Sequence, residues 1–401
     1  MVTRDRKQVV CVAYTVTAQV ARCLRDPAIL TALMSFVVIR IVLSVWMWGV
    51  RQAYPVPLPP HPVLRPYVGV AVETNPWLEP WQRWDTLHYQ AIAERGYAAF
   101  DSALFVPPLY PLLMRGLGAW LGGRTLLAGI LISNLACLGC LIALYRLTLQ
   151  EMADSAAARR SVIYLASFPA AFFLLAAYTE SLYVLAAILA LYAVGNKRWW
   201  KAGVWGAVAS LTRLPGALIV VPLAYAAWEA WRREHAWHVW SAVVLTLIGA
   251  AVFPLYIWLG LHLPPWTPLL VQSARFGGGL TWPGANMLEA ARRILAGQFY
   301  VADVLDLVFL LIFLVCAVPV CRKLSRVCAI YYAVLLLTYL TRIGGTGPLL
   351  STARYVLALF PAFILWGKWG ERPWVNRLIL YPSWVGLLFM SGQFAVWGWV
   401  G

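Results

Sequence analysis

The sequence predicts an all-α protein that crosses a membrane many times. Hydrophobic residues make up 62% of the 401-residue chain, and only 12% of residues are charged. Soluble proteins carry about twice that charged fraction. Many apolar stretches reach or approach the roughly 20 residues that a helix needs to cross a bilayer. Because backbone polar groups in lipid must be satisfied internally, a transmembrane helical bundle is expected.

About 11 spans can be drawn, and one membrane domain over residues 1–401 accounts for the whole length. Several of the segments are short, so two of them are expected to be half-helices. The pair 202–213 and 214–230 is interrupted by residues 212–216, TRLPG, and such irregular backbone at membrane depth must be buried in protein or line a wet cavity. The predicted spans are 28–50, 125–147, 161–178, 181–195, 202–213, 214–230, 239–260, 301–321, 327–341, 353–367 and 377–398.

The net charge of +16 reflects membrane topology rather than a nucleic-acid partner. Basic residues of membrane proteins gather in cytoplasmic loops. With the N-terminus inside, this rule places residues 51–124 and 261–300 on the extracytoplasmic side, of either a bacterial cytoplasmic membrane or an ER membrane. The segments on the inner side then hold 19 of the 32 Lys and Arg residues: Arg4, Arg6, Lys7, Arg22, Arg25, Arg146, Arg159, Arg160, Lys197, Arg198, Lys201, Arg232, Arg233, Arg322, Lys323, Arg326, Lys368, Arg372 and Arg377.

The first outer loop, residues 51–124, is long enough to have structure of its own. Residues 54–66 are Pro-rich and extended, whereas residues 84–96 predict an amphipathic helix. Residues 107–121 form an apolar segment that is expected to lie in the membrane interface. The loop therefore predicts juxtamembrane helices beside the bundle.

The segment 81–89, WQRWDTLHY, holds the leading candidate for chemistry. Asp85 would either cap the helix that follows or act as a general base, and its spacing does not separate the two interpretations. Tryptophan neighbours and nearby lipid are expected to raise the pKa of this carboxyl group. His88 lies one turn further on, where it would bond Asp85 or a sugar hydroxyl, or face water.

Two further candidates are Glu180 and Arg213. Glu180 follows Tyr178 and Thr179 at an outer turn, so these three residues form a polar cluster at membrane depth, where ionisable residues are usually functional. The alternative for Glu180 is a helix cap. Arg213 lies in the break between two short apolar segments and offers a bidentate fork for a phosphate. Its alternative is an interfacial arginine that extends toward water.

Arg342 and Arg354 bracket residues 344–348, GGTGP. The glycines would let backbone approach a ligand. This is not a nucleotide loop, because no strand precedes it and no Gly-Lys-Ser/Thr follows. Arg354, which precedes Tyr355, is the functional candidate of the pair, and Arg342 is interpreted as a flanking residue.

The remaining ionisable residues suggest no metal or cofactor. Asp303 and Asp306 begin a span and are interpreted as charges that complement the helix dipole. His235 and His238 lack acidic partners, so we expect a solvated loop there rather than a metal site. Because no nucleotide-binding motif is present, an outward-facing transferase would need a lipid-linked donor.

Five stretches together resemble the PIG-V family, GPI mannosyltransferase II and its bacterial relatives, within the GT-C class of glycosyltransferases. They occur in the family's order and span residues 83–361. Each motif alone is weak, but the set is fairly specific. The stretches are 83–97 (RWDTLHY, then IA and GY), 105–111 (FVPPLYP), 168–182 (FPA, then YTESL), 211–213 (LTR) and 354–361 (RYVLALFP).

The resemblance implies transfer of mannose from a polyprenyl-phosphate mannose, of the dolichyl-phosphate type, to a lipid- or protein-linked acceptor. It implies an inverting reaction that gives an α-mannoside, with Asp85 as the base that deprotonates the acceptor hydroxyl. Arg213 and Arg354 would hold the donor phosphate. Residues implied to contact sugar or acceptor, or to support Asp85, are Trp84, His88, Tyr110, Tyr178, Glu180 and Tyr355.

Two alternatives remain open at this stage. The same fold would serve another polyprenyl-phosphate sugar, and the residues barely separate this from mannose. A transporter or flippase for a lipid-linked substrate is the other alternative. Transporters often contain inverted repeats and charges near the midplane. Here the ionisable candidates lie toward the outer face and no repeat is visible, which favours the enzyme.

Overall fold

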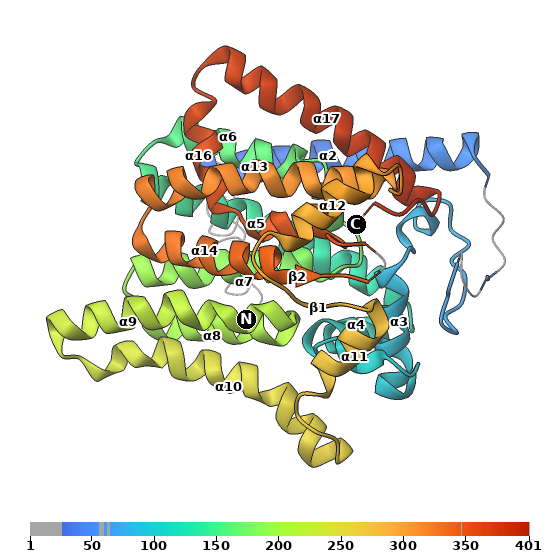
Figure 1. The fold of residues 1–401 in the computed structure, drawn as a ribbon, viewed down its shortest axis with the longest axis horizontal. Coiled ribbons are helices and arrows are strands. Elements are labelled where there is room, and N and C mark those ends of the chain that lie inside the picture. The colour runs from blue at the N-terminus through green and yellow to red at the C-terminus, as the bar shows by residue number, and fades with distance from the viewer. Residues whose placement is uncertain (1–25, 56–59, 62–64, 346, 401) are drawn as a thin grey trace, which may run out of the picture.

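The computed structural model describes residues 26–55, 60–61, 65–345 and 347–400. Its long helices run side by side along the horizontal of Figure 1, so their ends gather at two opposite faces. The α-helices are α2 (Pro27–Ala53), α3 (Asp85–Arg95), α4 (Leu109–Trp120), α5 (Thr125–Met152), α6 (Ser155–Ser167), α7 (Glu180–Gly195), α8 (Trp199–Thr212), α9 (Val220–Glu234), α10 (Ser241–Leu255), α11 (Thr267–Phe276), α12 (Ala285–Leu295), α13 (Val301–Lys323), α14 (Arg326–Thr341), α15 (Thr352–Tyr355), α16 (Pro361–Trp369) and α17 (Pro373–Ala395).

Short elements connect these helices. The two-residue strands β1 (Gly279–Leu280) and β2 (Arg342–Ile343) pair antiparallel. The remaining elements are short 3₁₀-helices and one π-helical turn: η1 (Glu79–Trp81), η2 (Gly96–Ala98), η3 (Ala103–Phe105), η4 (Ala171–Leu174), η5 (Leu214–Ile219), η6 (Trp237–Trp240), η7 (Tyr256–Gly260, the π turn) and η8 (Val356–Ala358).

The predicted all-α membrane architecture is confirmed in the described part of the chain. Six of its helical segments are long and apolar enough to cross a membrane, and α7 and α14 are shorter apolar helices. The total of about 11 spans stays a prediction. The six segments are Pro27–Ala53, Thr125–Met152, Leu214–Glu234, Trp237–Gly260, Val301–Lys323 and Pro373–Ala395.

The outermost helices expose apolar side chains, as helices in contact with lipid do. In α2, for example, Met34 and Ile41 are more than half exposed, whereas Leu43 and Met47 are fully buried. The outward faces of α10, α13 and α17 are apolar in the same way. In water such surfaces would be unfavourable, so their size supports a bilayer as the surrounding solvent.

Two predicted spans are broken rather than continuous. The prediction of one helix over 161–178 is wrong, because α6 ends at Ser167 and Pro169 follows, with the single turn η4 after it. The prediction for 353–367 is wrong in the same way, since α15 and η8 precede α16, which begins at Pro361. Proline lacks the amide N–H that a continuing helix needs, which explains both breaks.

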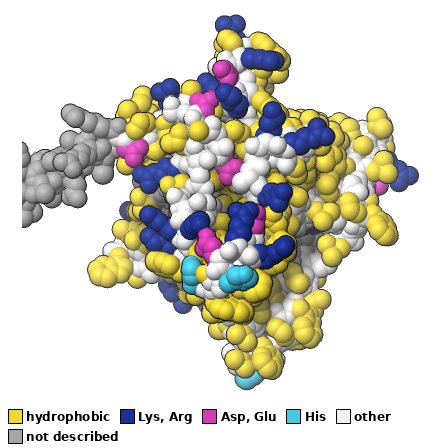
Figure 2. All heavy atoms as spheres, turned by 90° about the vertical axis from the view of Figure 1, so that its left-hand side faces the viewer, with side chains coloured by type: hydrophobic (Ala, Val, Ile, Leu, Met, Phe, Trp, Pro, Cys, Tyr) yellow, Lys and Arg dark blue, Asp and Glu magenta, His cyan; other side chains and the backbone are white. Residues whose placement is uncertain are grey.

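One end face of the bundle is rich in basic side chains. Figure 2 views the face at the left of Figure 1, and Lys and Arg side chains gather across it. The connections α9–α10, α13–α14 and α16–α17 lie at this end (Figure 1). They and the adjoining helix ends supply Arg232, Arg233, Arg322, Lys323, Arg326, Lys368 and Arg372. These three connections, which the sequence predicts to be cytoplasmic, therefore lie at one end, whereas Arg4, Arg6, Lys7, Arg22 and Arg25 lie outside the described residues.

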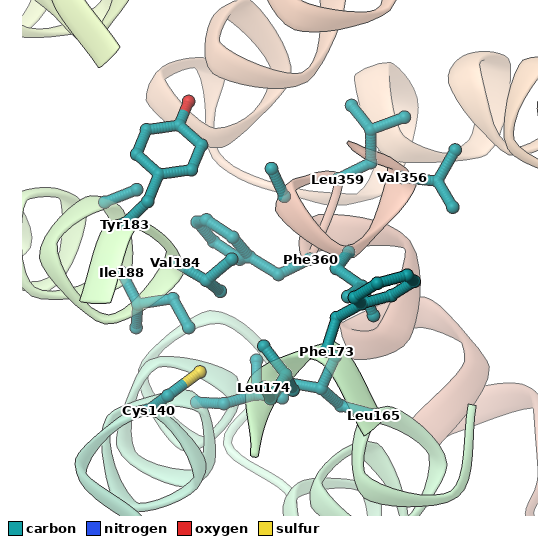
Figure 3. Close-up of a cluster of buried hydrophobic side chains, with 14 of the residues drawn as sticks. Cys140, Leu165, Phe173, Leu174, Tyr183, Val184, Ile188, Val356, Leu359 and Phe360 are labelled. Atoms are coloured by element: carbon teal, nitrogen blue, oxygen red, sulfur yellow. The ribbon is translucent and has the colours of Figure 1, made fainter. Parts of the chain in front are cut away.

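The opposite end carries the short helices α3, α4 and α11 (Figure 1). The predicted helix over 84–96 is confirmed as α3, and the apolar segment 107–121 contains α4. Between the two ends, the turns η4 and η8 pack into a continuous apolar core with α5, α6 and α7. Figure 3 shows this core, in which Phe173, Val184 and Phe360 lie close together.

Gly216 sets the sharp return of the chain after α8. A Cβ atom at this position would lie 2.0 Å from the Ala209 carbonyl oxygen, so the contact is backbone against backbone. We expect Gly216→Ala to destabilise the protein by about 1–3 kcal/mol, the usual cost of overpacking. Thermal unfolding in detergent measures this effect.

Gly116→Ala provides the matched control for this measurement. Gly116 lies in α4 with open space around its Cα, and alanine favours a helix over glycine by about 1 kcal/mol. The control should therefore be neutral or stabilising. Equal unfolding temperatures for Gly216→Ala and Gly116→Ala would contradict the close approach.

Candidate active site

The turn that leads into α3 is anchored by Arg83, whose side chain is fully buried. Its guanidinium donates to the Ala395 carbonyl oxygen from Nε at 3.0 Å and from Nη2 at 2.7 Å. The same Nη2 lies 2.6 Å from Glu79 Oε1, and the other oxygen of Glu79 pairs with Arg51. The ends of α17 and α2, together with Glu79, therefore hold this turn in place.

Trp84 follows Arg83 and has φ 50° and ψ −117°, an unusual conformation for a residue with a side chain. Such strain costs of order 1–3 kcal/mol and persists only where surrounding contacts impose it. Here the Trp84 ring packs edge-on against Trp397 and Trp399, with centroid distances of 5.6 and 5.0 Å. The strained residue directly precedes Asp85, so it determines where that carboxylate points.

Asp85 is the first residue of α3, but its side chain does not cap the helix. Trp84 occupies the cap position, without a side-chain hydrogen bond. The Asp85 carboxylate instead accepts a hydrogen bond from Arg354 Nη1 at 2.6 Å. The backbone N–H of Asp85 donates to the Tyr178 hydroxyl at 3.2 Å. The carboxylate is therefore free of a capping role and faces groups from other helices.

Four charged side chains form one cluster, which we call the charge cluster: Asp85, Glu180, Arg213 and Arg354. Glu180 is the first residue of α7 and its side chain is 3% exposed. It is hydrogen-bonded to Arg213 Nη1, and its Oε1 lies 3.2 Å from Arg354 Nε. Two carboxylates and two arginines from segments distant in sequence are thus in direct contact.

Arg354 lowers the pKa of the Asp85 carboxyl group, and the expectation of a raised pKa is wrong. Burial is the largest single influence and acts to raise this pKa, but the charge and hydrogen bond of Arg354, together with the charge of Arg213, outweigh burial and hold it below its usual value. The charge of a cation at 2.6 Å favours the ionised form. In this state Asp85 is ionised and ready to accept a proton, although its pairing with Arg354 reduces its basicity.

His88 is neutral in this site. Burial lowers the pKa of His88 to about 4, with Asp85 opposing the shift and Arg275 adding to it. Its Nε2 lies 2.6 Å from Arg275 Nη2, so the neutral ring accepts a hydrogen bond from this arginine. Its Nδ1 lies 3.8 Å from Asp85 Oδ1. His88 thus lies between Asp85 and Arg275, which belongs to α11.

Aromatic rings surround the two buried arginines of the cluster. The guanidinium of Arg354 lies 5.4 Å from the ring centroid of Tyr178 and 5.1 Å from that of Tyr355. The guanidinium of Arg213 also lies over Tyr355, at 5.0 Å. Such contacts orient a guanidinium without neutralising it. Both guanidinium groups therefore keep their charge, although each is also paired with a carboxylate.

Two adjoining pockets open beside the charge cluster. Both are lined by Arg213, Arg354, Tyr355, Pro215 and Gln272. The first, which we call the arginine pocket, is further lined by Glu180, Tyr183, Val184, Thr338, Tyr339, Arg342, Leu357 and Ala358. The second, which we call the aspartate pocket, is further lined by Asp85, Tyr89, Phe105, Val106, Pro107, Thr179, Thr212 and Leu214.

Trp84, His88, Tyr110 and Tyr178 are not among the lining residues of either pocket, although His88 and Tyr178 lie beside Asp85. Tyr110 is fully buried, and its hydroxyl lies 3.0 Å from the Gly129 carbonyl oxygen and 2.6 Å from Ser133 Oγ. The ring of Trp84 packs against Trp397 and Trp399. The structure therefore brings together Asp85, His88, Tyr178, Glu180, Arg213, Arg354 and Tyr355 from the predicted set, and places Trp84 and Tyr110 elsewhere.

Asp306 is a buried carboxylate rather than a surface charge at the start of a helix. It is 2% exposed, and its Oδ1 accepts a hydrogen bond from the Ala353 backbone N–H at 2.5 Å. The interpretation of Asp303 is confirmed, because its side chain accepts from the Tyr300 N–H in the first turn of α13. Asp306 thus holds the start of α15, the helix that carries Arg354.

Three polar residues of the site lacked a sequence signal. Gln272 and Arg275 belong to α11, in a segment without a recognisable motif, and Arg342 was interpreted as a flank. The pairing of β1 with β2 brings the segment after α11 against Arg342. Sequence alone contains no trace of that two-residue pairing, so it could not have placed these residues in the site.

The profile of the mannosyltransferase (PIG-V) family matches residues 59–230. This match confirms the resemblance found in the sequence, and it supports a membrane glycosyltransferase. Asp85, Glu180 and Arg213 lie within the matched region, whereas Arg354 lies beyond it. No curated protein matches the sequence.

Among solved structures, the oligosaccharyltransferase of Archaeoglobus fulgidus, tethered to an acceptor peptide containing the NVT sequon, is similar at 13% identity with a TM-score of 0.46. The alignment covers 91% of this chain and 55% of the oligosaccharyltransferase. The chain therefore spans about half the length of that enzyme.

Proposed function

We propose that the protein is an inverting mannosyltransferase that uses polyprenyl-phosphate mannose and acts on the extracytoplasmic side of the membrane. The observation that carries the proposal is the charge cluster, in which an ionised carboxylate and two arginines line two pockets that share a wall. Transfer from a phosphate-linked sugar needs a base on one side of the sugar and cations on the other.

The aspartate pocket suits the acceptor. In the proposed reaction an acceptor hydroxyl gives its proton to the Asp85 carboxylate as its oxygen bonds to C1 of the sugar. The bond between C1 and the phosphate oxygen breaks, and its electron pair stays on the phosphate. Attack from the face opposite the phosphate inverts the anomeric centre, so a β-linked donor gives an α-mannoside.

The arginine pocket suits the donor phosphate. Arg213 and Arg354 are both held by Glu180, and Arg354 is also held by Asp85. A phosphate that entered would compete with these carboxylates for the two guanidinium groups. Drawing Arg354 away from Asp85 would raise the basicity of Asp85 at the moment when both substrates are in place. The ion pair between Arg354 and Asp85 is therefore compatible with Asp85 acting as the base.

The position of the cluster favours an enzyme over a transporter. Asp85 and Glu180 begin α3 and α7, and Arg213 follows the last residue of α8. These are ends of helices, at the end of the bundle opposite the Lys- and Arg-rich face of Figure 2. Transporter sites usually lie near the bilayer midplane. Basic segments usually face the cytoplasm, which supports an extracytoplasmic site.

Sugar transfer by the purified protein in proteoliposomes tests the proposal. Polyprenyl-phosphate mannose and polyprenyl-phosphate glucose would be supplied in separate reactions, each with a lipid extract of the host as acceptor. We expect a mannosylated product that an α-mannosidase cleaves. A product from the glucose donor alone would contradict the mannose assignment. Movement of the donor across the bilayer without any product would instead favour a flippase.

A further inference from the structure

Arg342 is the third arginine of the arginine pocket, and the reaction described above gives it no role. It lies in β2, directly after α14, and its guanidinium is 5.2 Å from the ring centroid of Tyr355. Among the residues that the structure describes, no carboxylate forms an ion pair with Arg342. This distinguishes it from Arg213 and Arg354, which are both paired with acidic side chains.

The charges around the arginine pocket are therefore unbalanced. Arg213, Arg342 and Arg354 line the pocket, and the carboxylates that face them are Glu180 and Asp85. The arginines thus outnumber the carboxylates by one before a ligand enters. An anion is the ligand that such a site favours, and a low-dielectric surrounding strengthens the attraction.

The backbone around Arg342 is held in place on both sides. The Asn286 side-chain amide donates to the carbonyl oxygens of Arg342 and Tyr339, at 2.7 and 2.8 Å. A Cβ atom at Gly278 would lie 2.6 Å from the Ile343 carbonyl oxygen, so the two chains are in backbone contact there. Arg342 thus extends from a fixed position, which is what preorganised stabilisation of charge requires.

We propose that Arg342 recognises the second negative charge that the phosphate gains when the bond to the sugar breaks. This inference rests on the proposed function. A polyprenyl-phosphate sugar is a phosphodiester with one negative charge. When its C1–O bond breaks and the electron pair stays on oxygen, the product is a phosphate monoester, which carries about 1.5 to 2 negative charges at pH 7. Arg342 supplies the additional cation that this product needs.

Binding of two soluble probes tests the inference. Farnesyl phosphate represents the dianionic product, and farnesyl methyl phosphate represents the monoanionic donor. Affinities for the protein in detergent would be measured by calorimetry at pH 8. We expect the wild type to prefer farnesyl phosphate, and Arg342→Gln to lose roughly 10- to 100-fold of affinity for that probe, as expected for a lost charge-assisted bond. Its affinity for the methyl ester should change little.

Two further variants keep the result interpretable. Arg342→Lys retains the charge and should keep most of the preference, which would show that the fold survives substitution here. Arg292→Gln removes an exposed arginine of α12 and should leave both affinities unchanged. Equal weakening of both probes in Arg342→Gln, or no weakening, would overturn the role of Arg342 alone. Failure of the wild type to bind either probe would overturn the proposed function as well.

Discussion

Asp85→Asn is expected to lower the rate of sugar transfer by a factor of about 10² to 10⁴, the usual contribution of a positioned general base. Asparagine has nearly the same shape and can still accept the hydrogen bond from Arg354, but it cannot take a proton from the acceptor. Donor binding should persist, since the donor phosphate is assigned to arginines. Turnover and donor affinity, measured on the same reconstituted preparation, test both statements.

Asp101→Asn is the matched control for this substitution. Asp101 lies in the same connection between α2 and α5 as Asp85, but it is exposed. Its replacement should leave transfer unchanged. If the Asp85→Asn protein turned over at a near-normal rate, the carboxylate would serve only to hold Arg354. If it lost donor binding together with turnover, its role would be in assembling the site rather than in proton transfer.

Arg213→Ala is expected to weaken donor binding. A charge-assisted hydrogen bond contributes about 1.5–3 kcal/mol, which corresponds to roughly 10- to 150-fold in affinity. The change also leaves Glu180 with Arg354 as its remaining cationic partner, so some loss of stability is expected. Titration with polyprenyl-phosphate mannose and thermal unfolding separate the two effects.

Arg124→Ala removes an exposed arginine next to the start of α5 and serves as the matched control. Its affinity for the donor should equal that of the wild type. The donor affinity of Arg213→Lys should lie between that of Arg213→Ala and that of the wild type, since lysine keeps the charge but loses the bidentate fork. Unchanged donor affinity in Arg213→Ala would remove Arg213 from the phosphate site.

Much of the helical plan was predictable because apolar length alone determines it. The spans α2, α5 and α13 lie where the hydrophobic stretches begin and end. The broken regions were not predictable to the same degree. A proline inside an apolar stretch allows either a kink or an end of the helix, and packing against neighbouring helices decides between them.

The candidate site also has a part that the sequence predicts and a part that it does not. The four residues of the charge cluster could be found from the sequence, since ionisable groups at the ends of apolar segments are conspicuous. The orientation of rings could not, because tertiary contacts set it. Tyr110 points into the core toward Ser133, and Trp84 packs against Trp397. The pKa of Asp85 depended on Arg354, a residue 269 positions away along the chain.

That separation along the chain has a consequence for biosynthesis. Helices enter the membrane in the order in which they are made, N-terminal first. Asp85, Glu180 and Arg213 would thus be inserted long before the ribosome reaches Arg354. During this interval the nascent chain would hold a buried carboxylate without its cation, a state that is costly near lipid. Arg354 therefore supplies the cation for Asp85 only after most of the helices have been made. A chain that stops before Arg354 would be a natural target for membrane quality control.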